Sequence, residues 1–229
     1  MGINIRSSSQ HLPSSMTTVY HQLTITTAIP SNQPTNQPNL QQIPPNQKSH
    51  LTYIHPPPKM PSLITTQTLP TFTKGLKALH HLLTKAESHA TETSTPLSDL
   101  FSASLVADMK PLSFQVFIAT NTALKTLYRA SFLEPPSQEQ SDQTFEDLKN
   151  RVADTIRELE KADAALIESH QGKSFKAPMG PTEMEFTPES YVERYALPNF
   201  FFHLVTAYGI LRARGVPVGK MDYLGEFFA

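Results

Sequence analysis

His203 is the residue of this sequence whose type and surroundings most clearly allow chemistry. It lies in the run ALPNFFFHLVTAYGIL, residues 196–211, and is the only side chain there that can carry a charge near neutral pH. A helix that is apolar on almost every side is buried in a bundle. A histidine inside such a helix needs a hydrogen-bond partner or a metal. The sequence therefore predicts a site at His203, without naming a substrate.

Two interpretations of His203 follow from the residues around it. In the first, the ring is structural and is hydrogen-bonded to a hydroxyl or to the Arg194 carbonyl, which Pro198 leaves free because it has no N–H. In the second, His203 is the general base of a metal-free small-molecule binder or lyase-like catalyst in an aromatic pocket. Tyr208, or Gln115 from a family motif named below, would then orient a carbonyl of the ligand.

The first 61 residues differ in composition from the rest of the chain. They contain no Asp or Glu and hold half of the 20 prolines. They lack the apolar periodicity that offsets the entropy of ordering, so we expect residues 1–61 to be disordered. An appended tail, or an upstream start codon with Met60 as the working initiator, accounts for them. An organelle import signal stays open, although Arg6 alone gives it little support.

Residues 62–229 are expected to form one compact domain. They carry 16 basic and 20 acidic residues, and this mildly acidic balance argues against wide contact with nucleic acid. No apolar run is long enough to predict a membrane span. The chain has no cysteine, which excludes disulfides and thiolate ligands and fits a cytoplasmic protein. The partners we expect are a small-molecule ligand and, through an exposed helical face, a second copy of the chain.

The spacing of apolar residues predicts an all-α fold. Positions three and four apart repeat through four long segments, which is typical of a four-helix bundle. These segments are residues 70–90, 111–132, 141–170 and 187–215, the last of them kinked at Pro198. A short helical turn is expected at 98–105. Residues 173–187 predict a β-hairpin or extended loop before the last helix, turning at 179–181.

Three segments resemble a known family. They are PTFTKGLKALHHLLTKAESHA at residues 70–90, LVADMKPLSFQV at 105–116 and LPNFFFHLVTAYGILRARGVPVGKMDYLG at 197–225. The chain is similar in them to the family catalogued as domain of unknown function number nineteen ninety-three. That family belongs to the DinB/YfiT-like metalloenzyme superfamily. The resemblance implies a DinB/YfiT-like four-helix bundle that starts close to Met60.

The resemblance also implies a metal site, which this sequence does not complete. Superfamily members that bind a metal usually place one histidine on the second bundle helix and two more, four residues apart, on the last. Here His203 matches one position of the last helix, but Ala207 stands four residues later. No histidine lies between Thr91 and Glu168. We therefore expect an uncharacterised helical-bundle protein without the superfamily's full histidine triad and with a small-molecule pocket near His203.

Two matched motifs supply further candidates. Glu87 and His89 match the AExHA-like stretch of the family, and Asp108 and Gln115 match its DMxPLxxQV-like stretch. An incomplete site for a divalent transition metal is the alternative that the resemblance leaves open, built from His203, His89 and either Glu87 or Asp108. The chain would then be a metal-dependent hydrolase or thiol transferase that activates water or a thiol.

Overall fold

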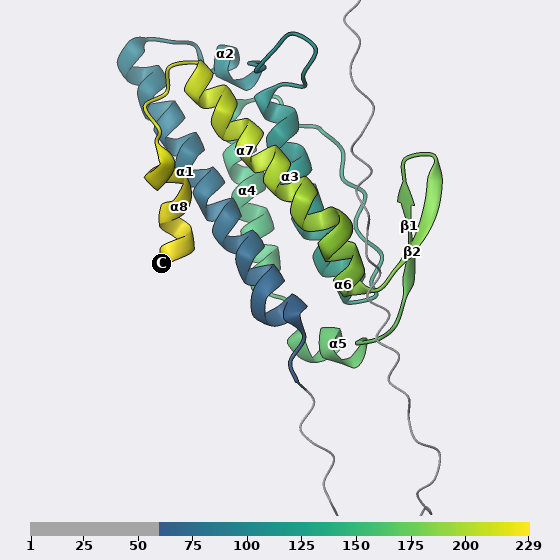
Figure 1. The fold of residues 1–229 in the computed structure, drawn as a ribbon. Helices are drawn as coiled ribbons and strands as arrows, with labels where there is room; N and C mark the ends of the chain where they lie inside the picture. Colours follow the sequence, from purple (N-terminus) through teal and green to yellow (C-terminus); the bar gives the residue numbers. More distant parts are fainter. Residues whose placement is uncertain (1–59) are drawn as a thin grey trace, which may run out of the picture. The chain divides into compact units, whose positions relative to one another are not determined.

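Four long helices form the body of the protein. The computed structural model describes residues 60–229, so nearly all of the segment predicted to be disordered lies outside the described residues. The long helices are α1 (Leu69–Thr93), α3 (Leu112–Ala130), α4 (Phe145–Glu160) and α7 (Leu197–Ala213). Helices α1 and α3 each pack against both α4 and α7, which confirms the predicted four-helix bundle (Figure 1). Within 60–229, no helix has the length and apolar character needed to cross a membrane.

Side-chain caps set the limits of α4. The Thr144 hydroxyl accepts a hydrogen bond from the Asp147 amide, and the Asp147 carboxylate accepts one from the Thr144 amide. This capping box starts the helix a few residues later than the predicted start at 141. The helix ends at Glu160, and the Asp163 carboxylate then caps the short α5 (Ala164–Ser169). The predicted third helix is therefore two helices.

The last long helix begins in three steps. Thr187 caps α6 (Pro188–Tyr191), a π-helical turn follows over Val192–Ala196, and α7 starts at Leu197 with Pro198 in its first turn. Proline has no N–H to donate, so the wider π turn lies where regular helical bonding is interrupted. The interruption expected at Pro198 is thus present as a change from π-helical to α-helical bonding. Gly215 follows α7 with φ 84°, as expected for a left-handed helix end.

A two-stranded hairpin separates α5 from α6. Strand β1 (Phe175–Met179) pairs antiparallel with β2 (Thr182–Phe186), and Gly180, with φ 65°, lies in the turn between them. The hairpin matches the prediction. Its buried face packs on the aromatic ring of Tyr191 at the start of the last helical segment, with Phe175 and Phe186 both edge-on to that ring.

Two short helices complete the fold. Helix α2 (Leu97–Phe101) follows α1, and α8 (Lys220–Phe228) lies along α1 at the end of the chain (Figure 1). The sequence analysis did not predict α8. Asp222 accepts hydrogen bonds from the Gly219 amide and from Lys85 of α1, and Lys74 donates to the last carbonyls of the chain. These contacts hold α8 in place.

A close contact in the core joins α1 to α7. Phe200 is fully buried, and its ring lies 4.8 Å from that of Phe72. Gly75 leaves room for it, since a Cβ atom at that position would lie 2.6 Å from Phe200 Cε1. A Cβ on Gly209 of α7 would instead meet Leu105 at an ordinary 3.9 Å.

These two helical glycines give a matched test of the packing. Replacing a helix-interior glycine by alanine stabilises the helix by about 1 kcal/mol, whereas overpacking a core costs about 1–3 kcal/mol. We expect Gly209→Ala to hold or raise the free energy of unfolding in urea. Gly75→Ala should be less stable than Gly209→Ala by about 1–3 kcal/mol. Equal stability of the two variants would contradict the close approach of Phe200 to α1.

Candidate functional site

His203 and Gln115 form a direct polar contact between α7 and α3. The ring nitrogen Nδ1 of His203 lies 2.7 Å from Oε1 of Gln115. The amide nitrogen of Gln115 donates to the Lys110 carbonyl at 2.8 Å, just before α3 begins. Gln115 is only 2% exposed, so both ends of its amide are satisfied inside the protein. The partner of His203 is thus this amide, and not the Arg194 carbonyl freed by Pro198.

This arrangement fixes which nitrogen of His203 carries the proton. Because the Gln115 nitrogen faces Lys110, its oxygen faces His203 and accepts. Nδ1 is therefore protonated, and Nε2 of the neutral ring is left with a free lone pair. In the part of the chain that the structure describes, Nε2 makes no hydrogen bond. It is also not among the fully buried polar atoms that lack a partner, so solvent reaches it.

The imidazole of His203 stays neutral at physiological pH. Burial lowers its pKa from 6.5 to about 4, because the charged ring would lose solvation. Gln115 offers an acceptor but no negative charge, and no ion pair involving His203 occurs within residues 60–229. The site therefore presents a neutral hydrogen-bond acceptor rather than a cation.

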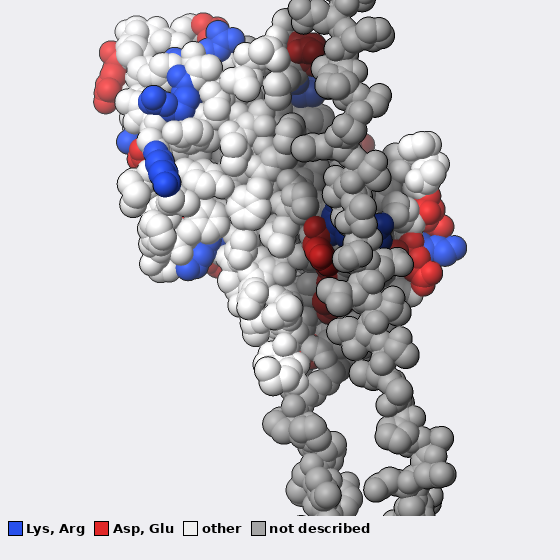
Figure 2. All heavy atoms as spheres, viewed as in Figure 1, with Lys and Arg blue, Asp and Glu red and all other residues white. Residues whose placement is uncertain are grey.

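Apolar side chains surround His203 on the outer side of α7. The rings of Phe114 and Phe202 are both edge-on to that of His203, with centroids 6.1 Å and 5.1 Å away. Phe202 and Val205 are 58% and 51% exposed. In Figure 2 the uncovered surface over the middle of α7 is white, and α7 carries no Lys, Arg, Asp or Glu before Arg212 in its last turn. Phe114 was not predicted as a site residue, although it directly precedes Gln115 in the predicted helix.

The structure does not bring Tyr208 to this site. Its ring packs edge-on against Tyr223 of α8, with centroids 6.2 Å apart. Five residues separate Tyr208 from His203, so the two side chains point to different sides of α7. Among the predicted catalytic residues, His203 and Gln115 are brought together and Tyr208 is not.

The predicted metal ligands are dispersed. Glu87 is paired with Lys149 of α4 at 2.8 Å, and His89 lies beside Gly215 at the far end of α7. Asp108 is exposed on the segment between α2 and α3. Within residues 60–229, no three His, Asp or Glu side chains are grouped so that they could hold a metal ion. These residues do not fit a superfamily-type metal site.

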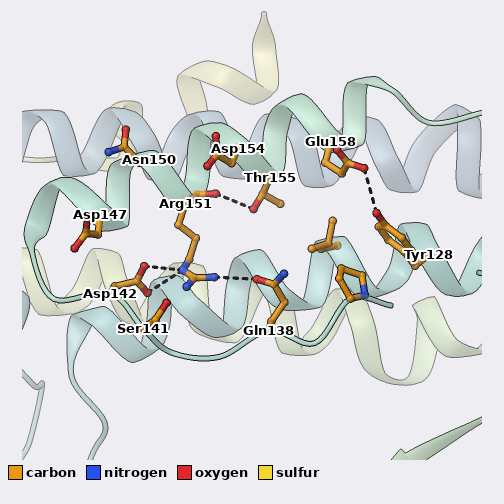
Figure 3. Close-up of a pocket in the computed structure, with 12 residues that line it drawn as sticks. Tyr128, Gln138, Ser141, Asp142, Asp147, Asn150, Arg151, Asp154, Thr155 and Glu158 are labelled. Carbon is orange, nitrogen blue, oxygen red and sulfur yellow. Dashed lines mark hydrogen bonds and ion pairs between the residues drawn. The ribbon is translucent and has the colours of Figure 1, made fainter. Parts of the chain in front are cut away.

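A polar cavity of about 560 Å³ lies between α3, α4 and the segment that joins them (Figure 3). Arg151 of α4 reaches across it to the joining segment. Its guanidinium donates to both oxygens of Asp142, to Oε1 of Gln138 and to the Glu139 carbonyl. Both members of the Arg151–Asp142 pair are largely buried. Arg151 therefore fastens the connecting segment to the bundle.

The other charged groups of this cavity are also engaged. Asp147 caps α4, Asp154 pairs with Arg157, and Glu158 accepts from the Tyr128 hydroxyl at 3.2 Å (Figure 3). These carboxylates cap a helix or bind neighbouring side chains. The charged groups of the cavity therefore have structural roles. His203 lines neither this cavity nor the one between α3, the segment after it and β1 that is described below, so neither is the pocket predicted beside His203.

The chain has recognisable relatives. Residues 64–224 match a family model described as Domain of unknown function (DUF1993). A crystal structure of a DinB family member from Shewanella denitrificans is similar in fold, with a TM-score of 0.66. The two sequences are 33% identical over 71% of this chain and 92% of that one. No functionally curated protein matched the sequence.

The lowered pKa of His203 predicts a pH dependence of stability. In the unfolded chain a histidine takes up a proton near pH 6.5, whereas in the folded protein His203 does so only near pH 4. Between these values the unfolded state binds more protons, so stability falls as the pH falls. We expect the free energy of unfolding in urea to drop more from pH 7 to pH 5 in the native protein than in His203→Gln. Equal drops would contradict a half-buried, neutral His203.

Proposed function

Because the chain belongs to the family described as Domain of unknown function (DUF1993), whose description assigns no activity, we propose a function from the site itself. The protein binds a small, neutral molecule on the outer side of α7, and Nε2 of His203 accepts a hydrogen bond from an O–H or N–H group of that ligand. The observation that carries the proposal is the contact of His203 Nδ1 with Gln115, which leaves Nε2 as a free acceptor.

Each residue of the site has a separate role in this proposal. His203 supplies the acceptor, and Gln115 is a positioning residue that holds the ring in one tautomer. Phe114 and Phe202 supply apolar surface for the body of the ligand. A neutral ligand is favoured because α7 bears no charged side chain before Arg212, in its last turn.

Binding suits this histidine better than proton abstraction. A general base works best when its pKa lies near the working pH, and burial holds that of His203 at about 4. At pH 7 such a ring accepts hydrogen bonds but removes protons only from acidic groups. We therefore place ligand binding first and general-base catalysis second among the functions of this site.

Phenol and toluene test the proposal because they share a ring and differ in the O–H group. We expect phenol to bind the native protein and to shift the NMR signals of His203, Phe202 and Phe114. His203→Phe keeps an aromatic ring but removes the acceptor. It should weaken phenol binding about fivefold, which corresponds to one hydrogen bond of about 1 kcal/mol. Toluene should bind both proteins equally weakly.

Two controls make the result decisive. Elemental analysis of native protein and His203→Ala, purified without a metal-chelating tag, should find no stoichiometric metal. One equivalent of a transition metal that the variant loses would overturn the metal-free proposal and favour a metalloenzyme.

Sedimentation of the same sample reports whether a second copy covers Phe202. Equal affinity of phenol for native protein and His203→Phe would remove His203 from the site.

A further inference from the structure

A second feature of α3 lies away from His203. Lys125 and Arg129 are one helical turn apart, and α3 contains no acidic residue at all. Both side chains line a cavity of about 680 Å³ formed by α3, the segment after it and strand β1. A cavity of this size lies within the range of small-molecule sites. Two cationic side chains of α3 therefore line the same cavity, and α3 itself carries no carboxylate.

Neither cation is neutralised within residues 60–229. Lys125 makes no hydrogen bond or ion pair there, and both burial and the nearby charge of Arg129 lower its pKa. Arg129 donates one hydrogen bond, from Nη1 to the Tyr191 hydroxyl at 2.5 Å, and stacks on that ring. Its other N–H groups have no acceptor among the described residues. Like charges at this spacing on a helix repel each other, so an anion placed between them would be stabilising.

Aromatic side chains also line this cavity. Phe132 follows α3 with φ 54°, a left-handed conformation that is rare for a bulky residue. Its ring stacks on His170 at 4.7 Å and meets Phe175 of β1 edge-on at 6.1 Å. Phe132 and Phe175 both line the cavity. The cavity thus combines cationic donors with apolar side chains that suit a flat or aliphatic group.

We propose that this cavity binds a small organic anion, a carboxylate or phosphate ester whose head group lies between Lys125 and Arg129 and whose apolar body lies on Phe132 and Phe175. The guanidinium fork and the ammonium group are the donors that recognise such head groups. Of the other charged lining residues, Lys176 is paired with Glu183 at 3.5 Å, and Glu134 lies on the segment after α3. This site is separate from the one at His203, and neither proposal depends on the other.

Calorimetric titration of the full chain with four probes tests the anion site. Benzoate and phenyl phosphate carry both a charge and a ring, inorganic phosphate carries only the charge, and benzyl alcohol carries only the ring. We expect benzoate, phenyl phosphate or both to bind more tightly than inorganic phosphate and benzyl alcohol. The anion that binds should also raise the midpoint of thermal unfolding. Which of them binds more tightly distinguishes a carboxylate from a phosphate ligand.

Substitutions locate the binding. Lys125→Gln should weaken binding of the preferred anion about tenfold or more, because it removes a charge-assisted hydrogen bond. The substitution should also raise the midpoint of thermal unfolding of the ligand-free protein, because it removes the repulsion between Lys125 and Arg129. Lys220→Gln makes the same charge change on α8 and should alter neither value. His203→Gln should also keep anion binding.

Three results would overturn the proposal. The first is no binding of either aromatic anion by the native protein. The second is equal binding by native protein and Lys125→Gln, which would move the anion elsewhere. The third is benzyl alcohol binding as tightly as benzoate and phenyl phosphate, which would show that the charge is not recognised. The thermal midpoint of Lys125→Gln confirms that the variant is folded in each case.

Discussion

The buried amide of Gln115 is the constraint on which the arrangement of α3 and α7 depends. An amide removed from water must pair at both ends, because each unsatisfied group costs about 1–3 kcal/mol. Lys110 satisfies one end before α3 begins, and His203 satisfies the other from α7. Closer to the start of α7, Asn199 donates to Thr122 at 2.8 Å. Helices α3 and α7 run antiparallel, and the two contacts lie one after the other along them. Together they fix the register of the two helices.

The same constraint decides the chemistry that His203 can perform. A carboxylate in place of Gln115 would favour a charged imidazole, whereas a neutral amide in a buried place keeps the ring neutral. Where superfamily members with a metal place a second histidine, this chain has Ala207, which is buried. The histidine is therefore held as a single acceptor between aromatic neighbours. The site is best described as a neutral hydrogen-bonding position on an apolar face.

The sequence predicted the long elements well because their signals are local. Apolar residues at helical spacing, the interrupted helix beside Pro198, and Gly215 after the last helix all appear where expected. Helix α8 was missed because it is short and is held by contacts with α1, such as Asp222 with Lys85, that link distant parts of the chain. Sequence spacing alone does not show such contacts.

The candidate site was predicted in part. His203 and Gln115 were both identified, one from its apolar surroundings and one from a motif, but nothing in their spacing predicted that they pair with each other. Tyr208 is near His203 in sequence and points elsewhere, since side chains five residues apart on a helix diverge. The pair of Lys125 and Arg129 gave no sequence signal, because two cations on a helix are ordinary until their lack of partners is known.

The tautomer of His203 at pH 7 is the most direct test of this account. Long-range nitrogen–proton NMR spectra of the imidazole distinguish a protonated Nδ1 from a protonated Nε2 and from the charged ring. Because Gln115 Oε1 accepts from Nδ1, we expect the neutral ring with its proton on Nδ1. We also expect this preference to be lost in Gln115→Leu. A charged ring, or a proton on Nε2 in the native protein, would contradict the account.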